Sequence, residues 1–519
     1  MIRKPDRHLY ITFLALALLA VALLLILRPP ATPYLDLLRQ GDAHAANTER
    51  TAAVAAYREA ARLRPGDPAP YLRLARLYLD WGRTGDALVA IAEAERLGRP
   101  DRFPKPVRSS ERLWIAVHTA RADWPAVVEH AGRPLALAPT DADARHALAR
   151  AYVELQEWEK AQAEYEALLR ADPADALAHE RLGALLVGTD PVAIQHLFAA
   201  RTGLANQLLA ALQAASTADD PAYASARLGR VLFEEQEWAL ATHQFERALS
   251  NDPDYPDAHA YLGYALDQLG HSGEAQFHLL RAVELAPDSA VAHTFLGLHH
   301  DRLGDFSAAR TEYETAYDLD PTNPATCVEI GQTWAAEGRY VAAEIWLREA
   351  VHLQPDDPAL WEALARFYLA HNVTAEGRGV EATARLVELS PDDARAHDLR
   401  GWAAFQVGDY RTAQDSLLRA TSLDPLLASA YYHLGRLWAA QGAQQKAQEA
   451  FVRALDLDTS GELAPLIERV MPPPSPSQGE GWGEGEKCIS KGEVHPPPAP
   501  PCEGGEHARS LSLPGRGLG

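Results

Sequence analysis

PDAHAYLGYALDQLGHSGEAQFHLLRAVELAPDS, residues 256–289, contains two stretches in which apolar or small side chains recur at the spacing of one helix face. The positions that share a face are Leu262, Gly263 and Leu266 in the first stretch and Ala275, Leu279 and Ala282 in the second. Gly270 stands between the two, where a helix commonly ends on a left-handed residue. Pro287 follows the second stretch, where a helix cannot continue. The segment therefore predicts a hairpin of two helices.

The proline that ends this hairpin recurs along the chain. Successive prolines lie 34 residues apart, apart from one interval of 36, in the series Pro253, Pro287, Pro321, Pro355, Pro391 and Pro425. We count about twelve units of this length: 34–67, 68–101, 108–141, 142–175, 176 to about 210, 222–255, 256–289, 290–323, 324–357, 358–393, 394–427 and 428–461. Such a period predicts an all-α array in which each hairpin buries its apolar face against its neighbours.

The units resemble the tetratricopeptide repeat, a hairpin of about 34 residues with small, aromatic and proline residues at fixed positions. Two units carry the pattern most fully: 290–323 with Leu296, Gly297, Ala309, Tyr313, Ala316 and Pro321, and 428–461 with Tyr431, Leu434, Gly435, Trp438, Ala447, Phe451 and Ala454. The resemblance implies a right-handed superhelical solenoid. It also implies a concave groove, lined by the first helix of each unit, that takes a protein or an extended peptide.

The N-terminal segment 9–27 has the properties of a membrane span. It contains no charged residue, and its 19 residues would reach about 28 Å as a helix, close to the thickness of the bilayer core. Arg3, Lys4 and Arg7 precede it, whereas Arg28 is the basic residue that follows closely. This asymmetry predicts a single-pass cell membrane protein with a cytoplasmic N-terminus and an extracytoplasmic repeat domain. We favour an uncleaved signal anchor; a cleaved signal peptide is the alternative.

The tail 472–519 is rich in proline and glycine and has almost no apolar periodicity, so we expect it to be disordered. Its stretch PSPSQGEGWGEG resembles the translation of interspersed palindromic repeats of bacterial DNA, which suggests a bacterial protein. Together with segment 9–27, this indicates a membrane-anchored bacterial protein. The predicted layout is 1–8 basic N-terminus, 9–27 anchor, 28–33 proline-rich connector, 34–210 first subarray, 211–221 spacer, 222–461 second subarray, 462–471 start of a capping helix, and 472–519 tail.

An arginine returns at the ninth position of five units, as Arg76, Arg150, Arg230, Arg366 and Arg436. Because that position lines the groove in the family, the resemblance implies an inner stripe of arginines. Acidic residues lie four positions after the first three arginines, which predicts modest ion pairs within the helix. Arg366 and Arg436 have alanine there, so we expect them to lack this partner.

These two arginines share the expected inner face with aromatic residues, a composition typical of binding hot spots. The candidate partner-binding residues, together called the C-terminal patch, are Arg366, Arg395, Trp402, Phe405, Tyr432 and Arg436. The alternative interpretation is that these residues serve helix packing and solvation.

Other chemistry is disfavoured by composition. The net charge of −22 argues against nucleic acid and for cationic partners. The three cysteines include no CxxC spacing. We interpret His259, His293 and His397, each at the fourth position of its unit, as structural, and we expect no catalytic residue, metal or cofactor.

The sequence therefore favours a membrane-anchored scaffold for protein–protein interaction that is not an enzyme. A non-catalytic subunit of an envelope biogenesis or export complex is the alternative. An enzyme or glycosyltransferase-associated subunit is a third and weaker alternative, because no stretch of domain size is left once the repeats are subtracted.

Overall fold

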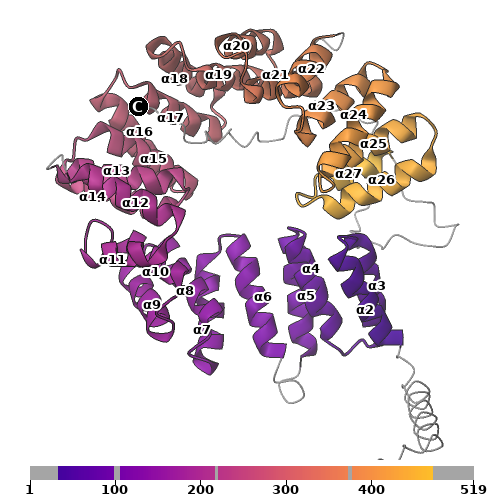
Figure 1. Ribbon diagram of the computed structural model, residues 1–519, viewed down its shortest axis with the longest axis horizontal. Coiled ribbons are helices and arrows are strands. Elements are labelled where there is room, and N and C mark those ends of the chain that lie inside the picture. The colour runs from indigo at the N-terminus through magenta and orange to yellow at the C-terminus, as the bar shows by residue number, and fades with distance from the viewer. Residues whose placement is uncertain (1–32, 99–105, 217–219, 372–376, 471–519) are drawn as a thin grey trace, which may run out of the picture. The chain divides into compact units, whose positions relative to one another are not determined.

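The computed structural model describes residues 33–98, 106–216, 220–371 and 377–470, and within these ranges it contains α-helices and no strands. The helices are α2 (Pro33–Ala46), α3 (Arg50–Leu63), α4 (Ala69–Asp80), α5 (Thr84–Leu97), α6 (Pro106–Ala120), α7 (Trp124–Leu137), α8 (Ala142–Glu154), α9 (Trp158–Ala171), α10 (Ala176–Leu186), α11 (Val192–Ala200), α12 (Gly203–Ala215), α13 (Pro221–Glu234), α14 (Trp238–Asn251), α15 (Pro256–Gln268), α16 (Ser272–Leu285), α17 (Ala290–Arg302), α18 (Phe306–Leu319), α19 (Pro324–Ala336), α20 (Tyr340–Leu353), α21 (Pro358–His371), α22 (Arg378–Leu389), α23 (Ala394–Gln406), α24 (Tyr410–Leu423), α25 (Ala428–Ala440), α26 (Gln444–Leu457) and α27 (Leu463–Val470). Apart from α12 and α27, they follow one another as helix pairs that match the predicted units (Figure 1).

The hairpin of α17 and α18 shows why these residues form two helices and a turn. Ser289 and Asp305 precede the two helices, and their side chains accept hydrogen bonds from the otherwise unpaired N–H groups of Ala292 and Ala308 at 3.3 and 3.1 Å. Gly304 has a φ of +77°, a left-handed conformation that costs glycine little, so α17 ends there. Gly270 has the same role after α15, as the sequence predicted.

Contact between the paired helices depends on a glycine. A Cβ atom built on Gly297 in α17 would lie 2.5 Å from Cε1 of Tyr313, which is fully buried in α18. Gly435 faces Phe451 in the same way. Small residues at this position therefore let a large side chain of the second helix fill the interior of the hairpin.

By internal contacts the described residues divide into two compact units, one within 33–121 with 455–462 and one within 122–454 with 463–470. In the first unit, the Asp456 carboxylate accepts hydrogen bonds from the N–H and hydroxyl groups of Thr51 at 2.7 and 2.5 Å. The expected spacer 211–221 falls inside the second unit, where α12 occupies residues 203–215 and packs against α11 and α13.

The membrane predictions concern residues outside the described ranges. The expected anchor, 9–27, and the tail, 472–519, both lie there. Within the described residues, every helix is too short or too polar to cross a bilayer.

Candidate interaction surfaces

Four of the six residues of the C-terminal patch meet where α23 packs against α25. The rings of Trp402 and Phe405 stack with centroids 5.1 Å apart. The Arg436 guanidinium lies 5.4 Å from the centre of the Trp402 ring and donates a hydrogen bond of 2.8 Å to the Tyr432 hydroxyl. The structure therefore brings together two rings and a cation, as in a cation–π contact.

The other two residues of the patch are placed differently. Arg366 is exposed on α21, and its Nε lies 2.9 Å from Oε1 of Glu362, one turn earlier in the helix. Arg366 thus lacks the expected partner four residues later, where Ala370 stands, but has one four residues earlier, a position that the sequence prediction did not consider. Arg395 is exposed at the start of α23, where Asp393 caps its N–H.

Tyr432 is also less accessible than the sequence suggested. Only 7% of its surface is exposed, and its ring lies 6.1 Å from that of Phe451, so it is mainly a packing residue. A ligand on this patch would therefore meet Trp402, Phe405 and Arg436, which are partly exposed.

A buried carboxylate positions Trp402. Asp398 accepts hydrogen bonds of 2.7 Å from the Ser429 hydroxyl and from Nδ1 of His433. The His433 ring stacks on Trp402 with centroids 4.4 Å apart. Because Asp398 is 4% exposed, these bonds form in a poorly solvated setting and fix the ring of His433, and thus one face of Trp402.

The first three arginines of the stripe behave as helix-surface residues. Arg76 and Arg150 lie 3.9 and 3.8 Å from carboxylate oxygens four residues later, as predicted, and all these groups except Glu154 are well exposed. Arg230 instead lies 5.5 Å from the centre of the Tyr261 ring in the next first helix. Loose ion pairs of this kind contribute little to stability.

A second surface, which the sequence analysis missed, spans α13, α15 and α17. We call it the aromatic face; its rings, Phe233, Tyr261, Tyr264 and Phe295, are all partly exposed. Tyr264 lies 4.8 Å from Phe295 and 5.2 Å from Phe233, and Tyr261 lies 5.0 Å from Phe233. Trp238, which begins α14, closes one end, 5.2 Å from Phe233. Side chains from three successive units thus form one continuous cluster.

Acidic groups lie beyond the aromatic face toward the C-terminus. Asp267 and His299 are buried and form a contact of 2.8 Å between Oδ2 and Nδ1. Burial, and then the charge of Asp301, raise the pKa of the Glu329 carboxyl to about 8. The Tyr313 hydroxyl is buried without a hydrogen-bond partner, and burial together with Glu329 and Asp301 raises its pKa.

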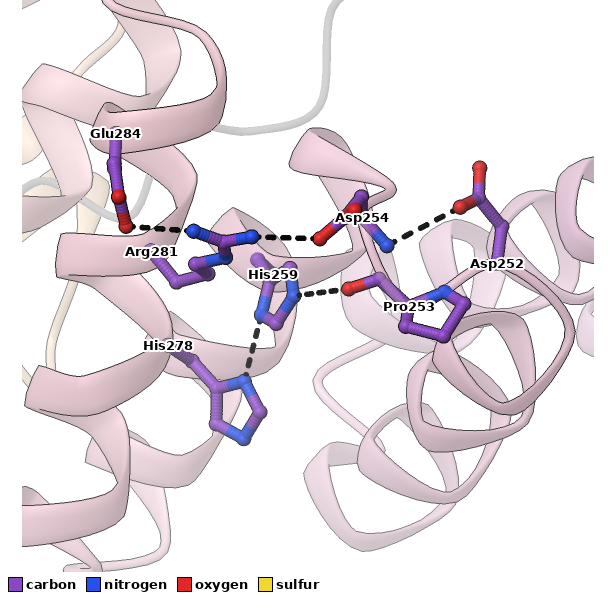
Figure 2. Close-up of polar contacts among 7 residues, drawn as sticks. All are labelled: Asp252, Pro253, Asp254, His259, His278, Arg281 and Glu284. Atoms are coloured by element: carbon purple, nitrogen blue, oxygen red, sulfur yellow. Dashed lines mark hydrogen bonds and ion pairs between the residues drawn. The ribbon is translucent and has the colours of Figure 1, made fainter.

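The histidines at the fourth position contact the proline that ends the preceding unit. Figure 2 shows Nε2 of His259 against the Pro253 carbonyl oxygen, at 3.0 Å, and Nδ1 of His259 facing Nδ1 of His278 at 2.9 Å. His293 and His397 contact the carbonyls of Pro287 and Pro391 in the same way, at 3.1 and 2.9 Å. The described residues include no group of three or more His, Cys, Asp or Glu side chains arranged to hold a metal ion.

Two family models, both of tetratricopeptide repeats, match the chain. The first covers residues 123–185, 232–298 and 302–367, the second covers 399–462, and together they cover about half of the sequence. The chain belongs to the tetratricopeptide repeat family.

Individual relatives share less. Small glutamine-rich tetratricopeptide repeat-containing protein 2 of Mycosarcoma maydis is 31% identical over 87 residues, 17% of this chain and 25% of that protein, so the chain spans a quarter of its length. A tetratricopeptide repeat protein of Parabacteroides merdae is 15% identical, with a TM-score of 0.39 over 48% of this chain and 98% of that one. Yeast Tom70 is 16% identical, with a TM-score of 0.37 over 84% of this chain and 96% of that one.

The aromatic face could have been predicted from the positions of its residues within the tetratricopeptide repeat. Within their units, Tyr261 and Phe295 stand at the sixth position, Tyr264 at the ninth and Phe233 at the twelfth. At the ninth position, only the arginines had been singled out as candidates. Reading the aromatic residues of neighbouring first helices together would have indicated this cluster.

Proposed function

We propose that the chain is a non-catalytic scaffold that binds a partner protein through the first helices of its tetratricopeptide repeats. The observation that carries the proposal is the arrangement of Trp402, Phe405 and Arg436, two stacked rings with a guanidinium beside them, all partly exposed. Tryptophan, tyrosine and arginine are enriched among the few residues that carry most of the binding energy of protein interfaces, where they fill well-packed, desolvated pockets.

The test is partner capture from detergent-solubilised membranes by wild type, Trp402→Ala and Arg436→Ala. Arg76→Ala is the matched control, because Arg76 stands at the same position of its unit and its partner, Asp80, is also exposed. We expect both patch variants, but not the control, to lose a captured protein while circular dichroism is unchanged. Equal capture by all four proteins would rule out the C-terminal patch.

We further propose that residues 9–27 hold the scaffold at a membrane with the repeats on the extracytoplasmic side. The support is the uncharged length of this segment and the basic residues before it. A reporter fused after Val470 should be active only outside the cytoplasm, and cytoplasmic activity would overturn the orientation. The identity of the captured protein would decide whether the scaffold serves an envelope biogenesis or export complex.

A further inference from the structure

The aromatic face continues into the acidic groups along equivalent positions of the repeat. Phe233, Asp267 and Asp301 follow one another at intervals of 34 residues, and so do Tyr261, Phe295 and Glu329. In the first series, a ring on α13 is followed by carboxylates on α15 and α17. In the second series, rings on α15 and α17 are followed by a carboxylate on α19. Because equivalent positions face the same way on stacked units, the rings and the partly exposed acids Asp301 and Glu329 belong to one surface, beneath which Asp267 is buried.

The rings are available to a ligand. They pack on one another, yet Phe233, Tyr261, Tyr264 and Phe295 each keep part of their surface exposed. Arg230 already lies over the Tyr261 ring at 5.5 Å. This contact shows that a ring of the aromatic face can bind a guanidinium group, because the face of an aromatic ring is electron-rich.

The acids differ in what neutralises them. Asp267 is paired with His299. Glu329 is only partly exposed, and the neighbouring charge that acts on it most strongly is that of another acid, Asp301. A nearby cation would stabilise the ionised form of Glu329, because it offsets both the repulsion by Asp301 and the cost of removing the carboxylate from water.

We propose that the aromatic face and Glu329 together bind a lysine- or arginine-bearing segment of a partner protein, with the basic side chain over the rings of Tyr264 and Phe295 and its charge toward Glu329. The inference rests on the scaffold function proposed above but assigns a different surface and a partner chemistry. A second copy of this chain is disfavoured as the occupant, because two chains of net charge −22 repel one another.

The probe is a fluorescent 12-residue peptide of alternating arginine and leucine, with a peptide of glutamate and leucine as its counterpart, titrated into the full-length protein in detergent. We expect the basic peptide to bind in fluorescence anisotropy and the acidic peptide not to bind. Glu329→Gln and Tyr264→Leu should each weaken binding of the basic peptide about fivefold or more, the order of a single cation–ring or ion contact.

Glu284→Gln is the control, since it removes one charge from α16, where Glu284 is exposed and pairs with Arg281. Equal weakening by Glu284→Gln and Glu329→Gln would mean that only the overall charge attracts the peptide, and would overturn the inference. Similar binding of the acidic and basic peptides would overturn it too. If Tyr264→Leu fails to fold, Glu329→Gln still decides, because a neutral amide is easier to bury there than a carboxylate.

A second readout comes from pH. A bound cation favours ionised Glu329, whose carboxyl has a pKa of about 8 in the free protein, so binding should tighten between pH 7 and pH 9 in wild type and not in Glu329→Gln. Trp402→Ala separates the two proposals. If Trp402→Ala loses partner capture but still binds the basic peptide, both proposals are supported. If Trp402→Ala loses partner capture and neither it nor wild type binds the basic peptide, only the basic-segment inference is overturned.

Discussion

The imidazole rings of His259 and His278 face each other through their Nδ1 atoms, which are 2.9 Å apart. The Pro253 carbonyl oxygen can only accept, so Nε2 of His259 donates to it; with a neutral His259 ring, Nδ1 then accepts and the proton between the rings belongs to His278. Burial, and then the nearby His259, lower the pKa of His278 to about 4.

This pair makes folding sensitive to acid. The unfolded chain takes up a proton at His278 near pH 6.5 and the folded chain only near pH 4, so stability is fully present above pH 6.5 and falls as the pH drops through this window. We expect a loss of about 1 kcal/mol between pH 7 and pH 5 from this group, after allowance for solvent screening. Urea unfolding at the two pH values measures it.

His278→Glu is the matched comparison, since Glu312 holds the equivalent place beside His293 at 2.7 Å. In this variant a carboxylate stabilises protonated His259, so the loss at pH 5 should shrink or change sign relative to wild type. The same pH dependence in both proteins would contradict the role of His278 in this sensitivity to acid.

The carbonyl contact at the fourth position should accept tryptophan in place of histidine. Trp361 stands at that position in its unit and donates from Nε1 to the Pro355 carbonyl at 2.8 Å. His397→Trp should therefore keep the bond to Pro391, whereas His397→Leu should cost about 1 kcal/mol. Hydrogen exchange of the α22–α24 amides would detect the local loosening; equal protection in both variants would count against a role for this bond.

Gly297→Ala should be strongly destabilising, by about 1–3 kcal/mol, because the new methyl group would overlap the Tyr313 ring in a packed interior. Gly273→Ala is its control. A Cβ on Gly273, in the first turn of α16, meets no atom within 4 Å, so alanine should be neutral or slightly stabilising there. Urea midpoints compare the two variants, and similar values would show that the hairpin tolerates a wider spacing.

Asp398→Ala should cost about 2–3 kcal/mol, because the Ser429 hydroxyl and Nδ1 of His433 lose a shared charged acceptor. Asp398→Asn keeps an oxygen for one of them and should cost less. If the carboxylate also positions Trp402, Asp398→Ala will reduce partner capture at temperatures where the protein remains folded. Unchanged tryptophan fluorescence in this variant would argue that the ring is held without it.

The hairpins could be predicted from the sequence because their determinants are local and repeat with a constant period. Gly304 ends a helix by its own backbone conformation, and Gly297 and Tyr313 belong to one unit. The surfaces could be predicted only in part, since they depend on contacts between units. The sequence identified Trp402 and Arg436 as neighbours, but not Glu362 as the partner of Arg366 or the burial of Asp398.

Phe295 and Glu329 occupy equivalent positions of neighbouring units, and this repeat spacing determines which residues of a bound segment can contact both units. Neighbouring first helices lie about 8–10 Å apart, and a polyproline II chain advances about 3.1 Å per residue with three residues per turn. A segment of this kind crossing the surface would pass from one helix to the next in about three residues, with every third side chain on the same side. The ligand residues that face equivalent positions of two neighbouring first helices would be separated by two others, so inserting one uncharged residue between them should abolish recognition while the net charge stays the same.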